Sequence, residues 1–217
     1  MSEPVPLDRF DEPALDASSI GTRLRVQRER LGLSLREIAR RVGVSASLIS
    51  QIERDKVNPS VSTLWSLVTE LGLRMGDIFP EEASPHLPLA ARRVQPVGHA
   101  VGPDTRAVLN LATGVRWERL TPTRDPLVEF LYVTYEPGSS SCEEDSLVRH
   151  GGHEYGYVMS GRLGVRIGFD EYELGPGGSV TFSASAPHRL WAIGGEPVQA
   201  IWVVVGREGD PRLHPNQ

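Results

Sequence analysis

Residues 34–72 read SLREIARRVGVSASLISQIERDKVNPSVSTLWSLVTELG, and this stretch decides the fold of the first half of the chain. Ser34, with Glu37 three residues later, has the pattern of a capping box at a helix N-terminus. The apolar side chains that follow are spaced for one face of a helix: Leu35, Ile38, Ala39 and Val42. Gly43 predicts a tight turn after this helix, because glycine adopts left-handed backbone angles without steric cost.

A second helix is expected directly after the turn, with Ser45 as its N-cap and its end near Arg54. Its inward side chains are expected to be Leu48, Ile49 and Ile52. The small Ala39 lets the two helices cross closely, so Ile38, Ile49 and Ile52 can fill the wedge between them.

Three more helices flank this pair in the expected fold. One occupies residues 20–31 and ends at Gly32. Another starts at residues 58–60, ends at Gly72, and turns four apolar side chains inward: Leu64, Leu67, Val68 and Leu71. Residues 75–79 predict a short fifth helix.

The stretch 34–72 resembles the lambda-repressor-like helix-turn-helix family, also called the XRE family, over the domain predicted for residues 19–80. In that family the helix after the turn lies in the DNA major groove. The outward positions of that helix are Ser45, Ala46, Ser47, Ser50, Gln51 and Arg54. Gln51 is suited to pair with adenine, Ser47 and Ser50 to reach base edges, and Ala46 to touch a thymine methyl group. The alternative is a helical bundle that binds no DNA.

Phosphate contacts are expected at the edges of this surface, from Ser34, Arg36, Arg54, Lys56 and Asn58. The resemblance also implies a structural ion pair between Arg28 and Glu53, which would hold the angle of the reading helix. The charge distribution agrees, because residues 20–79 hold ten Lys or Arg against six Asp or Glu, although the whole chain has a net charge of −5.

The second half of the chain changes to a period of two, with β-branched and aromatic residues between glycines and prolines. Strands are expected at residues 107–111, 115–120, 127–135, 155–159, 163–167, 172–174, 179–182, 189–193 and 198–205. The expected order is an acidic disordered tail (1–18), the helical domain (19–80), a linker (81–104), a β domain (105–208) and a tail (209–217).

Two segments of the β half carry polar residues in a distinctive pattern: HGGHEYGYVMSG at residues 150–161 and GPGGSVTFSASAPH at residues 175–188. They resemble the two motifs of the cupin family. His150, Glu154 and Gly161 match the first motif, and His188, which follows Pro187, matches the histidine of the second. The resemblance implies a small antiparallel jelly-roll barrel, so the predicted fold class is a multidomain α + β chain.

The pattern also departs from the cupin family. Val148 stands where the first motif usually has another histidine, and Ala192 replaces an asparagine that often follows the last one. The remaining set, His150, Glu154 and His188, suits Fe(II), Zn or Mn. Alternatively, these residues bind an organic effector without metal, or satisfy one another. His153 is expected at the rim, and His86, His99 and His214 are expected at the surface.

These features predict a DNA-binding transcription regulator that binds an operator as a homodimer and senses a small-molecule effector or a metal ion. The single cysteine, Cys142, and the lack of an apolar run or signal-like start predict a cytoplasmic protein without a membrane anchor. The alternative is a non-haem Fe(II) enzyme, since the hydroxypropylphosphonate epoxidase class also joins a helix-turn-helix to a cupin with a similar triad. The intact reading surface and the positive charge of residues 20–79 favour the regulator.

Overall fold

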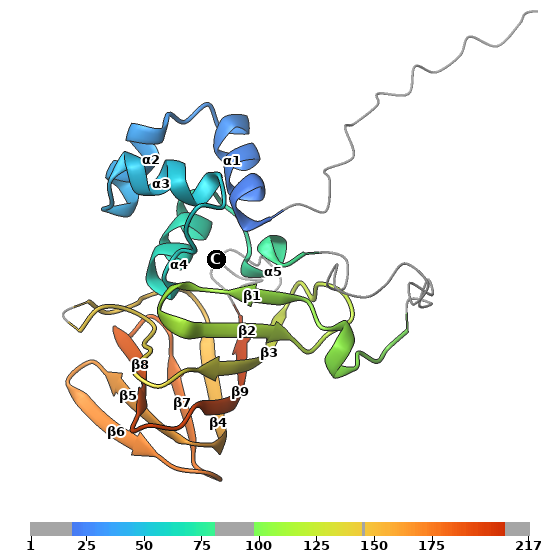
Figure 1. Ribbon diagram of the computed structural model, residues 1–217, viewed down its shortest axis with the longest axis vertical. Helices are drawn as coiled ribbons and strands as arrows, with labels where there is room; N and C mark the ends of the chain where they lie inside the picture. The colour runs from blue at the N-terminus through green and yellow to red at the C-terminus, as the bar shows by residue number, and fades with distance from the viewer. Residues whose placement is uncertain (1–18, 81–97, 145, 207–217) are drawn as a thin grey trace, which may run out of the picture.

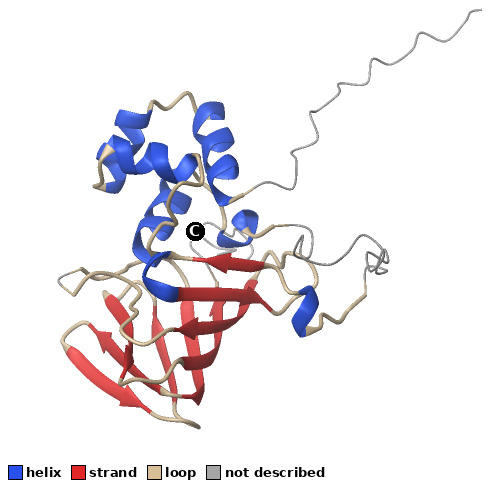
Figure 2. Cartoon of the chain, in the orientation of Figure 1, coloured by secondary structure: helices blue, strands red, loops and turns tan. Residues whose placement is uncertain are grey.

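The computed structural model describes residues 19–80, 98–144 and 146–206. The two expected tails and most of the expected linker lie outside the described residues. The helices α1 to α5 gather at one end of the molecule and the strands at the other, so the two halves form separate domains (Figure 2). Within the described end of the linker region, Pro103–Thr105 forms a 3-10 turn.

The helical domain contains α1 (Ile20–Arg30), α2 (Leu35–Val42), α3 (Ala46–Glu53), α4 (Val61–Glu70) and α5 (Met75–Ile78). A serine hydroxyl caps each of the first four helices by accepting a hydrogen bond from a backbone amide three residues on: Ser19, Ser34, Ser45 and Ser60. Gly43 ends α2 in the left-handed region, with φ of 80°. The predicted helix-turn-helix is therefore confirmed, including the conformation of its turn.

The wedge between α2 and α3 is filled as predicted, because Ile38, Ile49 and Ile52 are buried. Leu48 differs from expectation, since its side chain is only half-buried against this core. Leu48 lies one residue before Ile49, about 100° round the helix, so the two cannot both point to the centre of the core.

The β domain consists of two antiparallel sheets. Their strands are β1 (Val108–Asn110), β2 (Val115–Arg119), β3 (Val128–Tyr135), β4 (His153–Ser160), β5 (Arg162–Ile167), β6 (Asp170–Leu174), β7 (Ser179–Ser183), β8 (His188–Ile193) and β9 (Val198–Val205). One sheet has the order β1-β2-β3-β9-β4-β7 and the other β6-β5-β8. Both sheets bury apolar side chains between them, including Val158, Trp202, Leu163 and Val165, as a small jelly-roll barrel requires.

Four strands begin one or two residues earlier than the alternation of side chains predicts: β4, β5, β6 and β8. β4 begins at His153 and includes the buried Glu154, and β8 begins at the buried His188. A charged or polar side chain at an inward position interrupts the apolar pattern from which strands are predicted. The starts of β4 and β8 were therefore missed because polar side chains face the interior there.

The helical domain sits on one end of the barrel, and α4 lies nearest to it (Figure 1). The backbone amide of Ser62 on α4 donates to the carbonyl oxygen of Ser141 at 3.2 Å, and the amide of Ala112 donates to the carbonyl of Pro59 at 2.9 Å. The amide of Gly76 on α5 donates to Glu129 on β3 at 2.9 Å. One cluster of buried apolar side chains continues across this boundary, so the domains pack against each other directly.

Candidate DNA-recognition surface and metal centre

The expected reading surface of α3 is largely open to solvent. Ser45, Ser47, Gln51 and Arg54 are exposed, while Ile49 and Ile52 on the opposite side are buried. Ala46 and Ser50 differ from expectation, because both are half-buried. Ala46 lies three residues before Ile49, so it shares the flank of the helix that meets the core, and Ser50 follows it by one turn.

The residues expected to contact phosphates are also exposed: Ser34, Arg36, Arg54, Lys56 and Asn58. Ser34 is at the N-terminus of α2, where backbone amides and the positive end of the helix dipole favour an anion. Lys56 and Asn58 lie in the segment between α3 and α4. The reading surface therefore has potential phosphate ligands both before it and after it along the chain.

The ion pair between Arg28 and Glu53 joins α1 to the end of α3. Arg28 Nε donates to Glu53 Oε1 at 2.6 Å, and Nη2 donates to Oε2 at 2.8 Å. Arg28 also donates to the carbonyl of Leu33 at 2.8 Å, and the hydrogen bond to Glu53 raises the pKa of the Arg28 guanidinium above its ordinary value. The predicted structural pair is therefore confirmed, and its two parallel hydrogen bonds fix the direction of α3.

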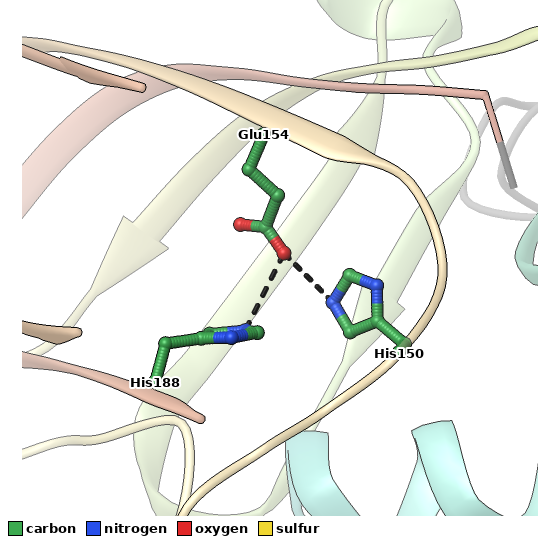
Figure 3. A group of neighbouring side chains, drawn as sticks. All are labelled: His150, Glu154 and His188. Carbon is green, nitrogen blue, oxygen red and sulfur yellow. Dashed lines mark ion pairs between the residues drawn. The ribbon is translucent and has the colours of Figure 1, made fainter. Parts of the chain in front are cut away.

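The three expected metal ligands converge inside the barrel (Figure 3). His150 precedes β4, Glu154 lies on β4, and His188 opens β8. His150 Nε2 lies 2.7 Å from Glu154 Oε1, and His188 Nε2 lies 3.4 Å from the same oxygen. Potential ligand atoms of the three residues lie within 4.8 Å of one another, and their side chains are only 3–4% exposed.

Backbone carbonyls set the protonation of both imidazoles. The Nδ1 atoms lie 3.0 Å from the carbonyl oxygen of Gly151 for His150 and 2.9 Å from that of Ala186 for His188. A carbonyl only accepts, so each Nδ1 carries a proton and each Nε2 faces Glu154. Three electron-rich atoms that converge in a buried place need a cation among them, either a proton on an imidazole or a metal ion.

Trp202, which neither of the two sequence motifs contains, orients the carboxylate. Its Nε1–H donates to Glu154 Oε2 at 2.6 Å, which leaves Oε1 directed at the two imidazoles. Gly156 makes room for the indole, since a Cβ atom at that position would lie 2.2 Å from the Trp202 ring. One feature of the sequence could have indicated this contact: Gly156 stands at an inward position of β4. A glycine inside a strand usually marks the close approach of another group.

The charges of the triad favour an ionised Glu154, while burial disfavours a charge on His188. Burial lowers the pKa of His188, against the opposing effect of the Glu154 carboxylate. Burial by itself raises the pKa of Glu154, but the hydrogen bond from His150 and the charges of both imidazoles outweigh burial and bring the pKa below its ordinary value. A neutral imidazole and an ionised carboxylate are the forms that coordinate a metal ion.

The other described histidines lie at the surface, and Val148, which departs from the cupin pattern, lies in the core. His153 is exposed, and its ring lies beside that of Tyr155, away from the triad. His99 is exposed as expected, while His86 and His214 lie outside the described residues. Val148 is buried and bridges to His188 through the backbone, so an apolar side chain stands where many cupins have a fourth ligand.

Comparison with known proteins agrees with both halves of the fold. A helix-turn-helix family matches residues 24–78, and the cupin domain family matches residues 131–204. A solved structure described as an HTH_3 family transcriptional regulator from Vibrio cholerae covers 88% of this chain and 97% of its own, with a TM-score of 0.54 at 22% identity. The chain thus joins a helix-turn-helix to a cupin domain.

Similarity in sequence identifies the family. The chain is 30% identical over 173 residues to the HTH-type transcriptional regulator PuuR of Escherichia coli K12, which covers 78% of this chain and 85% of PuuR. It is 26% identical over 182 residues to the HTH-type transcriptional regulator SutR of the same organism, covering 83% of this chain and 90% of SutR. The protein belongs to the HTH-type transcriptional regulators with a C-terminal cupin domain. Within the described ranges, its helices are too short or too polar to cross a membrane.

Proposed function

We propose that this regulator reads its operator through α3, with Gln51 as the main base-reading side chain. The exposed surface formed by Ser45, Ser47 and Gln51 supports this proposal, because the buried Arg28–Glu53 pair holds the helix behind it. Ala46 and Ser50, although half-buried, and Arg54 complete the proposed base-reading set. Ser34, Arg36, Arg54, Lys56 and Asn58 then supply the contacts to phosphates. A protein that acts on genomic DNA in this way works in the bacterial cytoplasm.

The cupin domain is proposed to be the sensor, with His150, Glu154 and His188 as ligands of a divalent Fe, Zn or Mn ion. The convergence of three ligand atoms within 4.8 Å carries this proposal. The bound ion would supply a Lewis-acidic centre to which a small-molecule effector can bind. The chain itself fixes both imidazole tautomers and orients the carboxylate through Trp202.

The direct test of the metal centre is elemental analysis of the purified protein after incubation with Fe(II), Zn(II) or Mn(II) and desalting. The expected result is about one ion per chain in the wild type and loss of that ion in His188→Ala. The matched control is His153→Ala, because His153 is an exposed histidine beside Glu154 in sequence and outside the triad. Equal metal content in the wild type and His188→Ala would remove the triad as a metal site.

The DNA-binding half is tested by selection of preferred sequences from a random DNA pool, with and without added Fe(II) or Zn(II). A regulator of this kind enriches paired half-sites, and its affinity falls steeply with salt. The enzyme alternative predicts no enriched sequence. A metal-dependent change in affinity for the selected sequence would connect the sensor to the operator, because a ligand shifts an equilibrium only through different affinities for its two states.

A homodimer is proposed to form through the outer face of the six-stranded sheet. Tyr155, Tyr157 and Met159 on β4 are 47–50% exposed there, and they lie beside Val203 and Ile201 of β9. Phe130 of β3 continues the row through Val203. An aromatic and aliphatic face of this kind suits a two-fold contact between copies, and two reading helices are what paired half-sites require.

Sedimentation analysis tests the dimer. Tyr155→Lys combined with Tyr157→Lys is expected to give a monomer, because a symmetric contact would bring like charges from both copies together. Phe169→Lys is the control, since Phe169 is fully exposed in the turn between β5 and β6 of the other sheet. A dimer that survives the double change would exclude this face as the contact.

A further inference from the structure

The cavity around the metal triad is enclosed by both domains. Its barrel walls include Trp117, Val148 and Trp202 together with the triad, and its remaining wall is formed by Val61, Trp65 and Met75 of the helical domain. Val61 and Trp65 belong to α4, and Met75 belongs to α5. The site assigned to the cupin domain is therefore completed by side chains of the DNA-binding domain.

Trp65 makes the closest contact between α4 and the triad. Its ring stacks on the imidazole of His150 with 3.7 Å between ring centroids and an angle of 7° between planes. The Trp65 side chain is buried, so most of the stacked pair is out of contact with water. Because Nδ1 of His150 is engaged by the Gly151 carbonyl, the stack holds the imidazole from its face while the hydrogen bond holds it from its edge.

Polar contacts on either side of Trp65 keep α4 and α5 in place over the cavity. The Ser62 amide reaches the Ser141 carbonyl on one side. On the other side, Arg124 of the barrel pairs with Asp77 of α5, and the Gly76 amide donates to Glu129. Gly76 itself lies against the Arg124 side chain, where an added Cβ would be 2.8 Å away. The helices are thus attached to the barrel around the cavity mouth.

We infer that Trp65 is a ligand-site residue contributed by the DNA-binding domain. The closed site admits a divalent cation with one or two waters, and a larger ligand fits only when α4 moves away from the barrel. This inference rests on the proposed metal centre. It identifies the contact through which occupancy of the cupin site acts on the helices that read DNA.

The size of the cavity decides which ligands fit. The closed cavity offers about 30 Å³ for the centres of water molecules, whereas one water needs roughly 10–15 Å³ of such space. A cleft of about 690 Å³ lies on the other side of Trp65, and both Trp65 and His150 line it. Arg74 of the helical domain and Arg149 of the barrel also line this cleft. An organic ligand in the cleft would therefore contact both members of the stacked pair, Trp65 and His150.

Movement of α4 would be transmitted to α3 through the helical core. α4 packs against α2, and α2 packs against α3. Leu64 of α4, Ile38 of α2 and Ile49 of α3 are fully buried in this packing. A tightly packed core of this kind moves as a unit rather than deforming gradually. A ligand that displaces Trp65 would therefore turn the whole reading domain relative to the barrel, and hence relative to the second reading domain of a dimer.

The experiment uses the full-length protein loaded with Zn(II) and measures zinc release to an excess of a chromogenic chelator. Trp65→Ala is expected to release zinc roughly threefold to tenfold faster than the wild type, the factor that corresponds to loss of one aromatic stack. Trp65→Phe retains a stacking ring and is expected to release zinc at close to the wild-type rate. Arg124→Ala loosens the domain contact from the barrel side, without altering the cavity wall, and is expected to accelerate release as well.

Hydrogen exchange of the α4 amides gives a second readout that does not depend on release rates. Zinc is expected to slow exchange across α4 in the wild type and to leave it unchanged in Trp65→Ala. Suppose the wild type binds zinc, but zinc does not slow exchange in α4 and Trp65→Ala releases zinc at the wild-type rate. That result would overturn this inference and leave the proposed metal centre intact. A wild-type protein that takes up no zinc, Fe(II) or Mn(II) would overturn the proposed metal centre and the inference together.

Discussion

The Arg28–Glu53 pair is the residue-scale feature on which the reading helix depends. Both residues are 8% exposed, and the two hydrogen bonds between them lie inside the helical domain. Arg28→Met or Glu53→Gln leaves the other partner buried without its counterpart, and each is expected to destabilise folding by about 3–5 kcal/mol. The double substitution is expected to cost less than either single one. Urea unfolding of the three variants measures this, and strictly additive losses would contradict the paired role.

Gly156 is the second residue-scale feature with a testable consequence. Gly156→Ala would push the Trp202 indole away from Glu154, and loss of such an orienting contact is expected to weaken zinc binding by roughly 10–100-fold. Competition with a zinc chelator measures the affinity. Gly164→Ala is the matched control, because its Cβ would meet the Trp191 ring at 2.0 Å in the other sheet. An equal loss of zinc affinity in both variants would show general damage to the barrel rather than a role in the site.

At the scale of the element, α3 and its flanks divide into base-reading and phosphate-binding positions. Gln51→Ala is expected to cost about 1–3 kcal/mol of operator binding and to relax the preference at one base pair. Lys56→Ala is expected to weaken binding to all sequences similarly and to lower the salt slope by about one. Titrations of the selected operator and of altered operators at several salt concentrations separate the two effects. Unchanged preference in Gln51→Ala would reassign the reading surface.

Sequence patterns predicted most of the elements, because the serine caps at Ser34 and Ser45, Gly43 and the alternating strands are local signals. They also predicted the triad, since His150, Glu154 and His188 lie in motifs of fixed spacing. Trp202 and Trp65 were missed for a physical reason. Each acts on a residue 48 or 85 positions away in the chain, and a buried tryptophan looks the same in sequence whether it fills a core or supports a site.

At the scale of the whole molecule, operator affinity depends on both the reading helix and the barrel. The Tyr155→Lys and Tyr157→Lys double variant leaves α3 intact, yet it is expected to bind the paired operator far more weakly at low protein concentration. The reason is that each monomer then engages one half-site without the other. Binding to a single half-site is expected to stay unchanged, and gel-shift titrations of both DNAs compare the two. An equal loss on both would point to a folding defect instead.

The stack of Trp65 on His150 limits how this architecture can be recombined. If the whole helical domain were exchanged for that of another regulator, the barrel would lose an aromatic side chain from its own binding site, even though every barrel residue stayed the same. A functional hybrid would have to inherit α4 together with the cupin, and so the natural point of exchange falls within the helical domain, before α4, rather than in the segment between the domains.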